Sequence, residues 1–395
     1  MKNLFTAIFS LGTLLLSAQN WVQKNDIPAP GRHHPVMFGI DNKGYYLTGT
    51  TSSSNVTKDF YEYDAASDSW TQKTSFPGAA RSFAIGHTYQ GKGYVGFGLS
   101  ATQYLNDLWV FDPSTDDWTR LADCPCEGRR HPAMVIKNDK IFVGLGDGPS
   151  GNLRDWWEYD IASDSWKQQA SLPALGRHHP FQFTTGDYVY SGLGHAGNTI
   201  FDDWYRYDPV NEAWTQMADF PGEARVAGTQ FHHGHYGYVL SGDGDDHSYM
   251  PTGEFWRYDD DTDTWTELDP HPGISRWAPG SFVIDHKVYF TGGQNRQTGA
   301  LYNDLWVYEL GIPASVEKAN KSAIQLHPNP FNENIFISNN SEVKSIKIFN
   351  VLGKEISNIS NPNSTLNLED IPIGIYFFEI ENTNGESHTK RLIKN

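Results

Sequence analysis

Cysteine is scarce in this chain. Only two occur among 395 residues, Cys124 and Cys126, and no histidine or further cysteine stands at metal-site spacing from them. This scarcity argues against a cysteine-based metal site. We expect a structural or inert pair, for instance a tight local disulfide, and the alternative is a strained, redox-active Cys-x-Cys bridge.

Positive charge is also in short supply. The chain has 30 Lys and Arg against 47 Asp and Glu, which gives a formal net charge of −17 at pH 7. Residues 321–395 hold seven Lys or Arg and eight Asp or Glu, so nearly all of the excess lies before them. Phosphate binding and docking on an anionic bilayer need a basic face, so we expect no nucleic acid partner. Solubility outside the cell is the simplest role for this charge.

Only one long apolar run is present, at the N-terminus. Lys2 precedes the apolar run from Leu4 to Leu16, and Ser17-Ala18 supply small residues before Gln19. This order predicts a secretory signal peptide at residues 1–18 rather than a membrane span. No cysteine follows it, which argues against a lipoprotein anchor, and we expect no transmembrane segment elsewhere.

What the chain does contain is a repeated interval of eleven residues from Trp to Arg. The six pairs are Trp21/Arg32, Trp70/Arg81, Trp118/Arg129, Trp166/Arg177, Trp214/Arg225 and Trp265/Arg276. A glycine stands seventeen residues after each Arg, at Gly49, Gly98, Gly146, Gly194, Gly242 and Gly293. Subtraction places successive Trp residues 48 to 51 apart. A period of this length is typical of propellers, solenoids or arrays.

Each unit has the composition of four short strands. Val, Ile, Tyr, Phe and Trp fill the strand positions, and Gly, Pro, Asp and Ser fill the joints. No segment in the repeats has a long helical period. Six such units predict an all-β, six-bladed propeller.

The repeats resemble the kelch family over roughly residues 21–310. The matching features are the Arg at the start of the first strand, the Gly closing the second, Tyr/Phe-Asp ending the third and the Trp opening the fourth. The kelch double glycine is complete only at Gly292-Gly293. The five incomplete units suggest that the first glycine position serves mainly packing. We expect the propeller to occupy residues 19–310.

The phase of the repeat predicts how the ring closes. Trp21 lacks a preceding third strand, and the unit of Trp306 lacks its fourth strand. We therefore expect Trp21-Val-Gln-Lys to pair with Leu305-Trp-Val-Tyr308, which leaves no exposed edge between the first and last units.

Composition changes after Leu310. Residues 311–321 read as a linker, and residues 322–395 read as short alternating strands of a small β-sandwich. This stretch resembles the C-terminal sorting domain (type A) of the type IX secretion system of Bacteroidetes. The matching motifs are Pro328-Asn-Pro330, Asn350-Val-Leu-Gly353, Gly374-Ile-Tyr376 and the terminal Lys390–Asn395. The resemblance implies the type IX secretion machinery as a partner and a secreted or cell-surface location. The alternative is an adhesive domain that stays on the mature protein.

The repeats also separate scaffold from candidate site. The Trp and Gly present in every unit read as packing and turn residues. The six arginines, Arg32, Arg81, Arg129, Arg177, Arg225 and Arg276, are expected to begin the innermost strands and to ring one mouth of the channel. Two roles are possible for these arginines: they form ion pairs with loop carboxylates, or their planar guanidinium groups bind the carboxylate of a ligand.

Positions that vary between units are free to serve a ligand. Two rows of them fall near the same mouth, just after each Arg and just after each repeat Gly. Their candidate ligand-binding members are His33, His34, His131, His178, His179, Trp277, Asp147, His195 and Asp243. Together with the arginines they would form a bowl suited to a polar or sugar-like ligand. Imidazole and carboxylate also bind metals, but no local ligand spacing is present, so we expect hydrogen-bonding histidines, no metal and no cofactor.

An enzyme needs a named acid or base. Glu127 and Glu223 stand two residues before their Arg, at equivalent loop positions, and are the candidates for proton transfer. They would suit the exported six-bladed kelch sialic acid epimerases (mutarotases), which this chain resembles in architecture and compartment. We therefore predict a module that binds an extracellular glycan or protein, with a carbohydrate-active enzyme of the N-acetylneuraminate epimerase type as the alternative.

Overall fold

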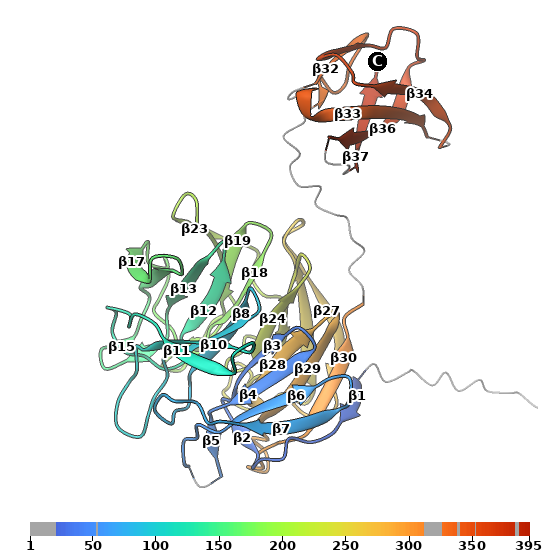
Figure 1. The fold of residues 1–395 in the computed structure, drawn as a ribbon. Coiled ribbons are helices and arrows are strands. Elements are labelled where there is room, and N and C mark those ends of the chain that lie inside the picture. Colours follow the sequence, from blue (N-terminus) through green and yellow to red (C-terminus); the bar gives the residue numbers. More distant parts are fainter. Residues whose placement is uncertain (1–20, 53, 312–325, 338–339, 352, 384–386) are drawn as a thin grey trace, which may run out of the picture. The chain divides into compact units, whose positions relative to one another are not determined.

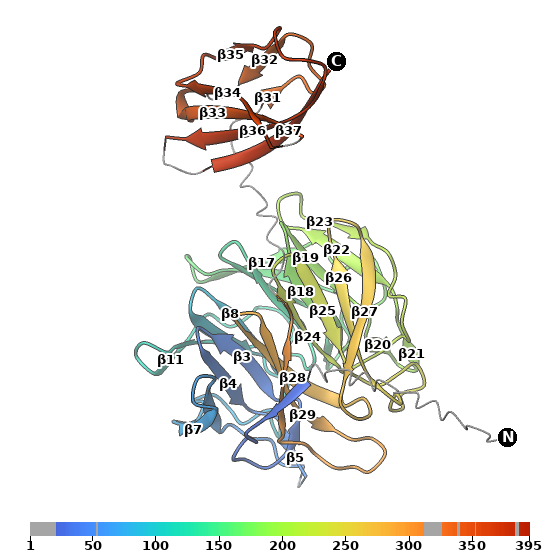
Figure 2. The same ribbon diagram turned by 90° about the vertical axis from the view of Figure 1, so that its right-hand side faces the viewer.

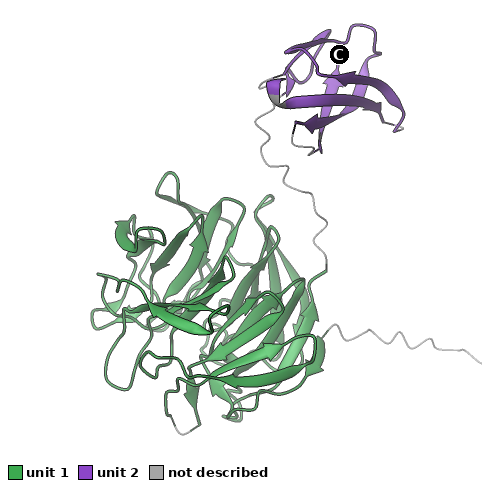
Figure 3. Cartoon of the chain, in the orientation of Figure 1, with its two compact units in different colours: residues 1–313 green, residues 314–395 purple. Residues whose placement is uncertain are grey.

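A computed structural model describes residues 21–52, 54–311, 326–337, 340–351, 353–383 and 387–395. The expected signal peptide and all but residue 311 of the expected linker lie outside the described residues. Two compact units divide the chain, residues 1–313 and residues 314–395 (Figure 3). Within the part of the chain described here, no helix has the length and apolar character needed to cross a membrane.

The first unit holds six antiparallel sheets of four strands each among its described residues (Figure 1). From the innermost strand outward, blade 1 is β3 (Val36–Ile40), β4 (Lys43–Leu47), β6 (Phe60–Asp64) and β7 (Ser69–Lys73), and blade 2 is β8 (Ile85–Tyr89), β9 (Lys92–Gly96), β10 (Leu108–Asp112) and β11 (Asp117–Arg120). Blade 3 is β12 (Ala133–Lys137), β13 (Lys140–Gly144), β16 (Trp156–Asp160) and β17 (Ser165–Gln169), and blade 4 is β18 (Phe181–Thr185), β19 (Tyr188–Gly192), β22 (Trp204–Asp208) and β23 (Ala213–Gln216). Blade 5 is β24 (Thr229–His233), β25 (Tyr236–Leu240), β26 (Gly253–Asp259) and β27 (Thr264–His271), and blade 6 is β28 (Trp277–Ile284), β29 (Lys287–Gln294), β30 (Leu305–Glu309) and β1 (Trp21–Lys24).

The innermost strands form a closed ring. Neighbouring contacts run from β3 to β8, β12, β18, β24 and β28, and from β28 back to β3. Figure 2 shows several of these strands gathered at the centre of the unit. The ring encloses a channel, so residues that are far apart in the sequence meet around a single axis.

The sixth blade is completed by the start of the described chain. β1 pairs with β30 in the register Trp21↔Tyr308 to Lys24↔Leu305, which is the pairing that the sequence predicts. Trp21 is 3% exposed and packs on Phe255, Phe290 and Tyr308. Both ends of the propeller therefore share one sheet.

The backbone conformation explains why glycine recurs at this position of every unit. Every one of the six has a positive φ, from 78° to 109°, and a Cβ on Gly146 would lie 2.7 Å from the carbonyl oxygen of Arg130. The residue before it is also left-handed in all six units, with φ from 55° to 69°. The left-handed backbone at this first position favours glycine in addition to the packing that the sequence suggests.

The six repeat arginines are buried inside the blades. Each pairs with a carboxylate of its own blade: Arg32–Asp59, Arg81–Asp107, Arg129–Asp155, Arg177–Asp203, Arg225–Glu254 and Arg276–Asp304. Their side chains are at most 5% exposed. In four blades the indole of the third strand donates to the same carboxylate, as Trp157 Nε1 does to Asp155 Oδ2 at 2.7 Å. The arginines precede the innermost strands rather than begin them.

Short elements complete the mouth of the propeller. They are the pairs β2 (Arg32–His33) with β5 (Thr50–Thr51), β14 (Asp147–Gly148) with β15 (Gly151–Asn152), and β20 (His195–Ala196) with β21 (Thr199–Ile200). On the loop after β11, Cys124 and Cys126 form a disulfide, and both residues are buried. Burial of this bridge favours the structural reading of the pair.

The second unit is a small sandwich of two sheets. β31 (Leu326–His327), β32 (Asn334–Ile337) and β35 (Thr365–Asn367) form one sheet, and β34 (Glu355–Ser360), β33 (Val343–Asn350), β36 (Gly374–Asn382) and β37 (Ser387–Lys394) form the other. A short 3₁₀ helix spans Asn340–Glu342. Phe331, Ile335, Ile346 and Phe378 lie in the core shared by the two sheets, each at most 1% exposed.

Candidate functional site

The second residue after each repeat Arg faces the channel. This row consists of His34, Phe83, His131, His179, Ala227 and Ala278, and all six have a left-handed φ between 50° and 60°. Backbone hydrogen bonds link the row from blade to blade, with His34 N donating to Ala278 O at 2.8 Å and His131 N to Phe83 O at 2.9 Å. We call these six residues the inner row.

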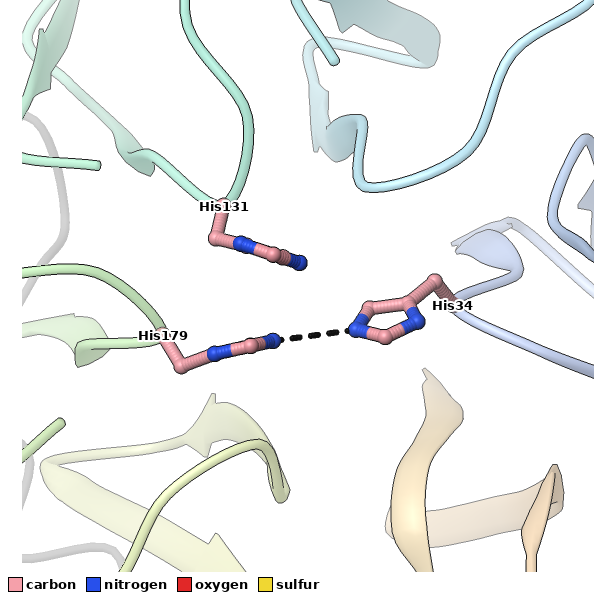
Figure 4. Close-up of side chains that lie close together, drawn as sticks. All are labelled: His34, His131 and His179. Atoms are coloured by element: carbon pink, nitrogen blue, oxygen red, sulfur yellow. Dashed lines mark hydrogen bonds between the residues drawn. The ribbon is translucent and has the colours of Figure 1, made fainter. Parts of the chain in front are cut away.

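Three inner-row histidines converge although they come from blades 1, 3 and 4. His34 Nε2 lies 3.0 Å from His179 Nε2, and the rings of His131 and His179 have centroids 3.5 Å apart. Figure 4 shows the rings of His34 and His179 pointing at each other, with His131 beside them. One nitrogen from each of the three lies within 4.8 Å of the others. The sequence analysis selected all three residues.

Aromatic rings border this histidine group. The Trp277 ring lies 4.7 Å from both His33 and His34, centroid to centroid, and Phe83 lies 4.5 Å from His34 and His131. Phe83 occupies the inner row of blade 2, so the repeat fixes its position as it does for the histidines.

A second pair of rows forms the rim of the mouth. In every blade the first residue after the Arg pairs with the first residue after the repeat Gly. The six pairs are His33↔Thr50, Ser82↔Leu99, Arg130↔Asp147, His178↔His195, Val226↔Asp243 and Trp277↔Gln294. The two variable rows expected at one mouth therefore meet residue by residue. We call these twelve residues the rim.

Two Arg–Asp pairs that involve rim residues are set against aromatic rings. Arg130 Nε lies 2.7 Å from Asp147 Oδ2, and the Arg130 guanidinium lies over Phe83 and Tyr104. Arg296, which lies next to the rim, has its Nε 3.2 Å from Asp243 Oδ2, and its guanidinium lies 5.2 Å from the Trp277 ring centroid. The sequence analysis missed both arginines, although Arg130 directly follows a repeat Arg.

The site's histidines are neutral at pH 7. Burial lowers the pKa of His34, His131 and His179 well below the usual value, and neighbouring histidines or Arg130 lower it further. Burial, with Arg296 for His33 and His195 for His178, lowers the pKa of these two to about 4. Neutral imidazole offers one donor and one lone pair, so this group can accept hydrogen bonds or bind a cation.

Asp243 has the opposite behaviour. It is 1% exposed, and its burial raises the pKa to about 7 despite Arg296. Its Oδ1 has no hydrogen-bond partner among the described residues. A carboxyl group with a pKa near 7 can exchange a proton at neutral pH.

The channel contains two cavities. The upper one, of about 120 Å³, is lined by His34, His131, His179 and Phe83 among others. The lower one, of about 490 Å³, is lined by His87, His232 and His233. His87 and His232 stack with centroids 6.0 Å apart, and the sequence analysis missed them because no repeat position marks the middle of the inner strands.

The structure does not bring every candidate to this site. The six repeat arginines are held by carboxylates inside their blades, as described above, so their guanidinium groups are closed to a ligand at the mouth. Glu127 and Glu223 lie on the loops that lead into blades 3 and 5, where Glu127 Oε1 accepts from Ser150 N at 2.7 Å and Glu223 Oε1 from Asp245 N at 3.1 Å. Neither glutamate lines the upper cavity, and neither does Asp243.

Comparison with known proteins addresses the fold and the tail. The family model described as the Attractin/LZTR1 beta-propeller matches residues 44–270, and the secretion system C-terminal sorting domain model matches residues 325–395. No curated protein matches the chain. The solved structure entitled "Structure of YjhT" is similar at a TM-score of 0.61 and 16% identity, over 71% of this chain and 95% of that one. At this identity the likeness shows the fold alone, and with the family matches it confirms the predicted propeller class and sorting domain.

Proposed function

Because the chain belongs to the Attractin/LZTR1 β-propeller family and ends in a secretion-system sorting domain, we propose that it is an exported module that binds an extracellular glycan at the propeller mouth. Its sorting domain directs the chain across the outer membrane to the cell surface or the medium. Glycan binding is the further step proposed here, and a protein ligand at the same mouth is the competing outcome.

The rim carries this proposal. Trp277 offers an aromatic ring with the Arg296 guanidinium over it, and Arg130 and Asp147 offer charged, planar groups. Neutral imidazoles of His33 and His178 add hydrogen-bonding edges. A few polar groups around an aromatic face are what a sugar ring with its hydroxyl groups requires.

A glycan array with the labelled chain tests the proposal. We expect binding to a defined set of glycans, and at least about tenfold weaker binding for Trp277→Ala and Arg130→Ala, since each removes more than about 1.4 kcal/mol of contact. His286→Ala is the matched control, because His286 lies in the turn between β28 and β29, at the opposite end of β28 from Trp277, and pairs with Glu309. Absence of any glycan ligand, together with capture of a defined extracellular protein that Trp277→Ala abolishes, would move the proposal to a protein ligand.

Asp243 favours one alternative, a carbohydrate-active enzyme of the N-acetylneuraminate epimerase type. A general acid or base works best with a pKa near the working pH, and burial gives Asp243 such a value beside the Arg296 cation. Glu127 and Glu223, the candidates from the sequence, accept hydrogen bonds from backbone N–H groups of neighbouring loops instead.

Exchange NMR on N-acetylneuraminate anomers tests this alternative. An enzyme would accelerate exchange over buffer, and Asp243→Asn would remove the acceleration while Glu223→Gln kept it. Equal exchange rates with and without the protein would exclude the mutarotase activity and leave the binding proposal untouched.

A further inference from the structure

The three inner-row histidines that line the upper cavity, at the head of the channel, have the composition of a metal site. Three imidazole nitrogens, one each from His34, His131 and His179, lie within 4.8 Å of one another. Such sets are uncommon because each buried imidazole needs its own hydrogen-bond partner. Here the partners of the histidines are largely other histidines.

His131 is the residue whose environment is least satisfied. It is 8% exposed, and neither of its ring nitrogens has a hydrogen-bond partner among the described residues. A buried polar group without a partner costs about 1–3 kcal/mol of folding stability, which suggests that His131 has a function that offsets this cost. Its ring lies against His179 and points into the same group.

We propose that His34, His131 and His179 bind one divalent transition-metal ion at the head of the channel. Imidazole is a ligand that Zn²⁺, Cu²⁺ and Ni²⁺ share, so the class of ion follows from the donors. The site stands independently of the proposed glycan binding.

The spacing of the donors fits this class of ion. Two nitrogens bound to one tetrahedral Zn²⁺ at about 2.0–2.1 Å are about 3.3 Å apart. His34 Nε2 and His179 Nε2 already lie 3.0 Å apart. The two rings point at each other in the structure, and binding would turn them so that both lone pairs meet at the ion.

The outer nitrogens of two of the ligands are held in place. His34 Nδ1 lies 2.7 Å from His33 Nδ1, and His179 Nδ1 lies 3.4 Å from His195 Nε2. Metal-binding histidines commonly have their second ring nitrogen in a hydrogen bond that fixes the ring orientation. His33 and His195 therefore act as positioning residues in the proposal.

The residues around the proposed site tolerate the positive charge of the metal ion, and the upper cavity leaves room for a fourth ligand of that ion. The nearby cation Arg130 is paired with Asp147 at 2.7 Å, so its charge is compensated. The three histidines also line the upper cavity of about 120 Å³. That volume exceeds what one water molecule needs, so water or a ligand group can take the fourth position.

Three blades of the propeller itself show which substitutions the inner row accepts. Ala227 and Ala278 adopt φ of 51° and 52°, and Phe83 adopts 60°, where the three histidines have 50° to 53°. His34→Ala and His131→Ala are therefore expected to fold, and His131→Phe fills more of the site without a ligand atom.

The test is Zn²⁺ titration of the EDTA-treated full chain, purified without a histidine tag, in competition with a chromophoric chelator. We expect one Zn²⁺ per chain. Loss of a second-shell partner costs about 10–100-fold in affinity, so His34→Ala, His131→Ala and His131→Phe should each cost at least about 100-fold. His87→Ala, in the lower cavity, is the matched control and should bind as the parent does.

Each other outcome overturns the assignment. No Zn²⁺, Cu²⁺ or Ni²⁺ binding by the folded parent chain would show that the histidines serve hydrogen bonding alone. Binding that survives His131→Ala but is lost in His178→Ala would move the ion to the neighbouring group of His178, His179 and His195. Circular dichroism of every variant separates lost binding from lost folding.

Discussion

Arg129 donates two hydrogen bonds to the carboxylate of Asp155, at 2.7 Å from Nη1 and 2.8 Å from Nη2. The Arg129 side chain is fully buried, and its pairing is repeated with a carboxylate in the other five blades. Burial alone would raise the pKa of Asp155, but the bonds from Arg129 hold it below the usual value. The carboxylate is therefore charged at neutral pH and belongs to the framework of blade 3.

Breaking this pair should destabilise the propeller. Asp155→Asn leaves a buried guanidinium without its counter-charge, so we expect the free energy of unfolding to fall by about 3–5 kcal/mol in urea titrations. Asp123→Asn is the matched control, because the Arg120–Asp123 pair is about half exposed and contributes about 0–1 kcal/mol. Equal small effects of both substitutions would contradict a structural role for the repeat arginines.

Closure of the ring depends on Trp21. Trp21→Ala removes a buried ring that packs on Phe255, Phe290 and Tyr308, and we expect a loss of about 3–5 kcal/mol. Val22→Ala on the same strand is the control, since Val22 is 54% exposed. Thermal unfolding measures both, and a melting temperature for Trp21→Ala equal to that of Val22→Ala would show that β1 adds nothing to closure.

Lowering the pH should destabilise the propeller before most of its carboxylates bind protons. Burial lowers the pKa of ten histidines in the fold, namely His33, His34, His87, His131, His178, His179, His195, His232, His233 and His271. The unfolded chain binds protons at these residues near pH 6.5 while the folded chain does not. The contribution of these neutral histidines to the free energy of unfolding is present above about pH 6.5 and is lost as the pH falls toward about 4.

Asp243 has the opposite effect on how stability changes with pH. Its raised pKa means that the folded state holds a proton that the unfolded state releases. One carboxyl group is outweighed by ten histidines. We expect the melting temperature in EDTA to fall by at least about 4–8 °C from pH 7.5 to pH 5.0, which corresponds to about 2 kcal/mol. His131→Ala should reduce this slope, and a melting temperature that does not change over this range would contradict the account.

The sorting domain should suffice for export. Fusing residues 311–395 to a periplasmic reporter in a bacterium with a type IX system should carry the reporter to the surface or medium. Deleting residues 322–395 from the chain should leave the propeller in the periplasm. Cell fractionation measures both, and secretion of the truncated chain would contradict the sorting role.

The sequence predicts the propeller well because every blade solves the same packing problem. Trp118, Gly146 and their equivalents recur at a fixed interval, so strand order and the β1–β30 pairing follow from their phase. It also indicates the rim, since residues next to an invariant Arg or Gly share a place in every blade.

The sequence does not say what each side chain does there. The partner of Arg129 lies 26 residues later, and one signal was available, since an acidic residue stands two before the aromatic of every third strand. The meeting of His34 with His179 depends on a left-handed backbone and on ring diameter, which no local pattern reveals.

The most direct measurement locates the ligand on the propeller. Long-range ¹H–¹⁵N spectra of the histidine rings would be recorded while a glycan identified on the array is added. We predict shifts for His33, His178 and His195 at the rim and none for His87 and His232 in the lower cavity. Shifts confined to the lower cavity, or none at saturating glycan, would contradict binding at this mouth.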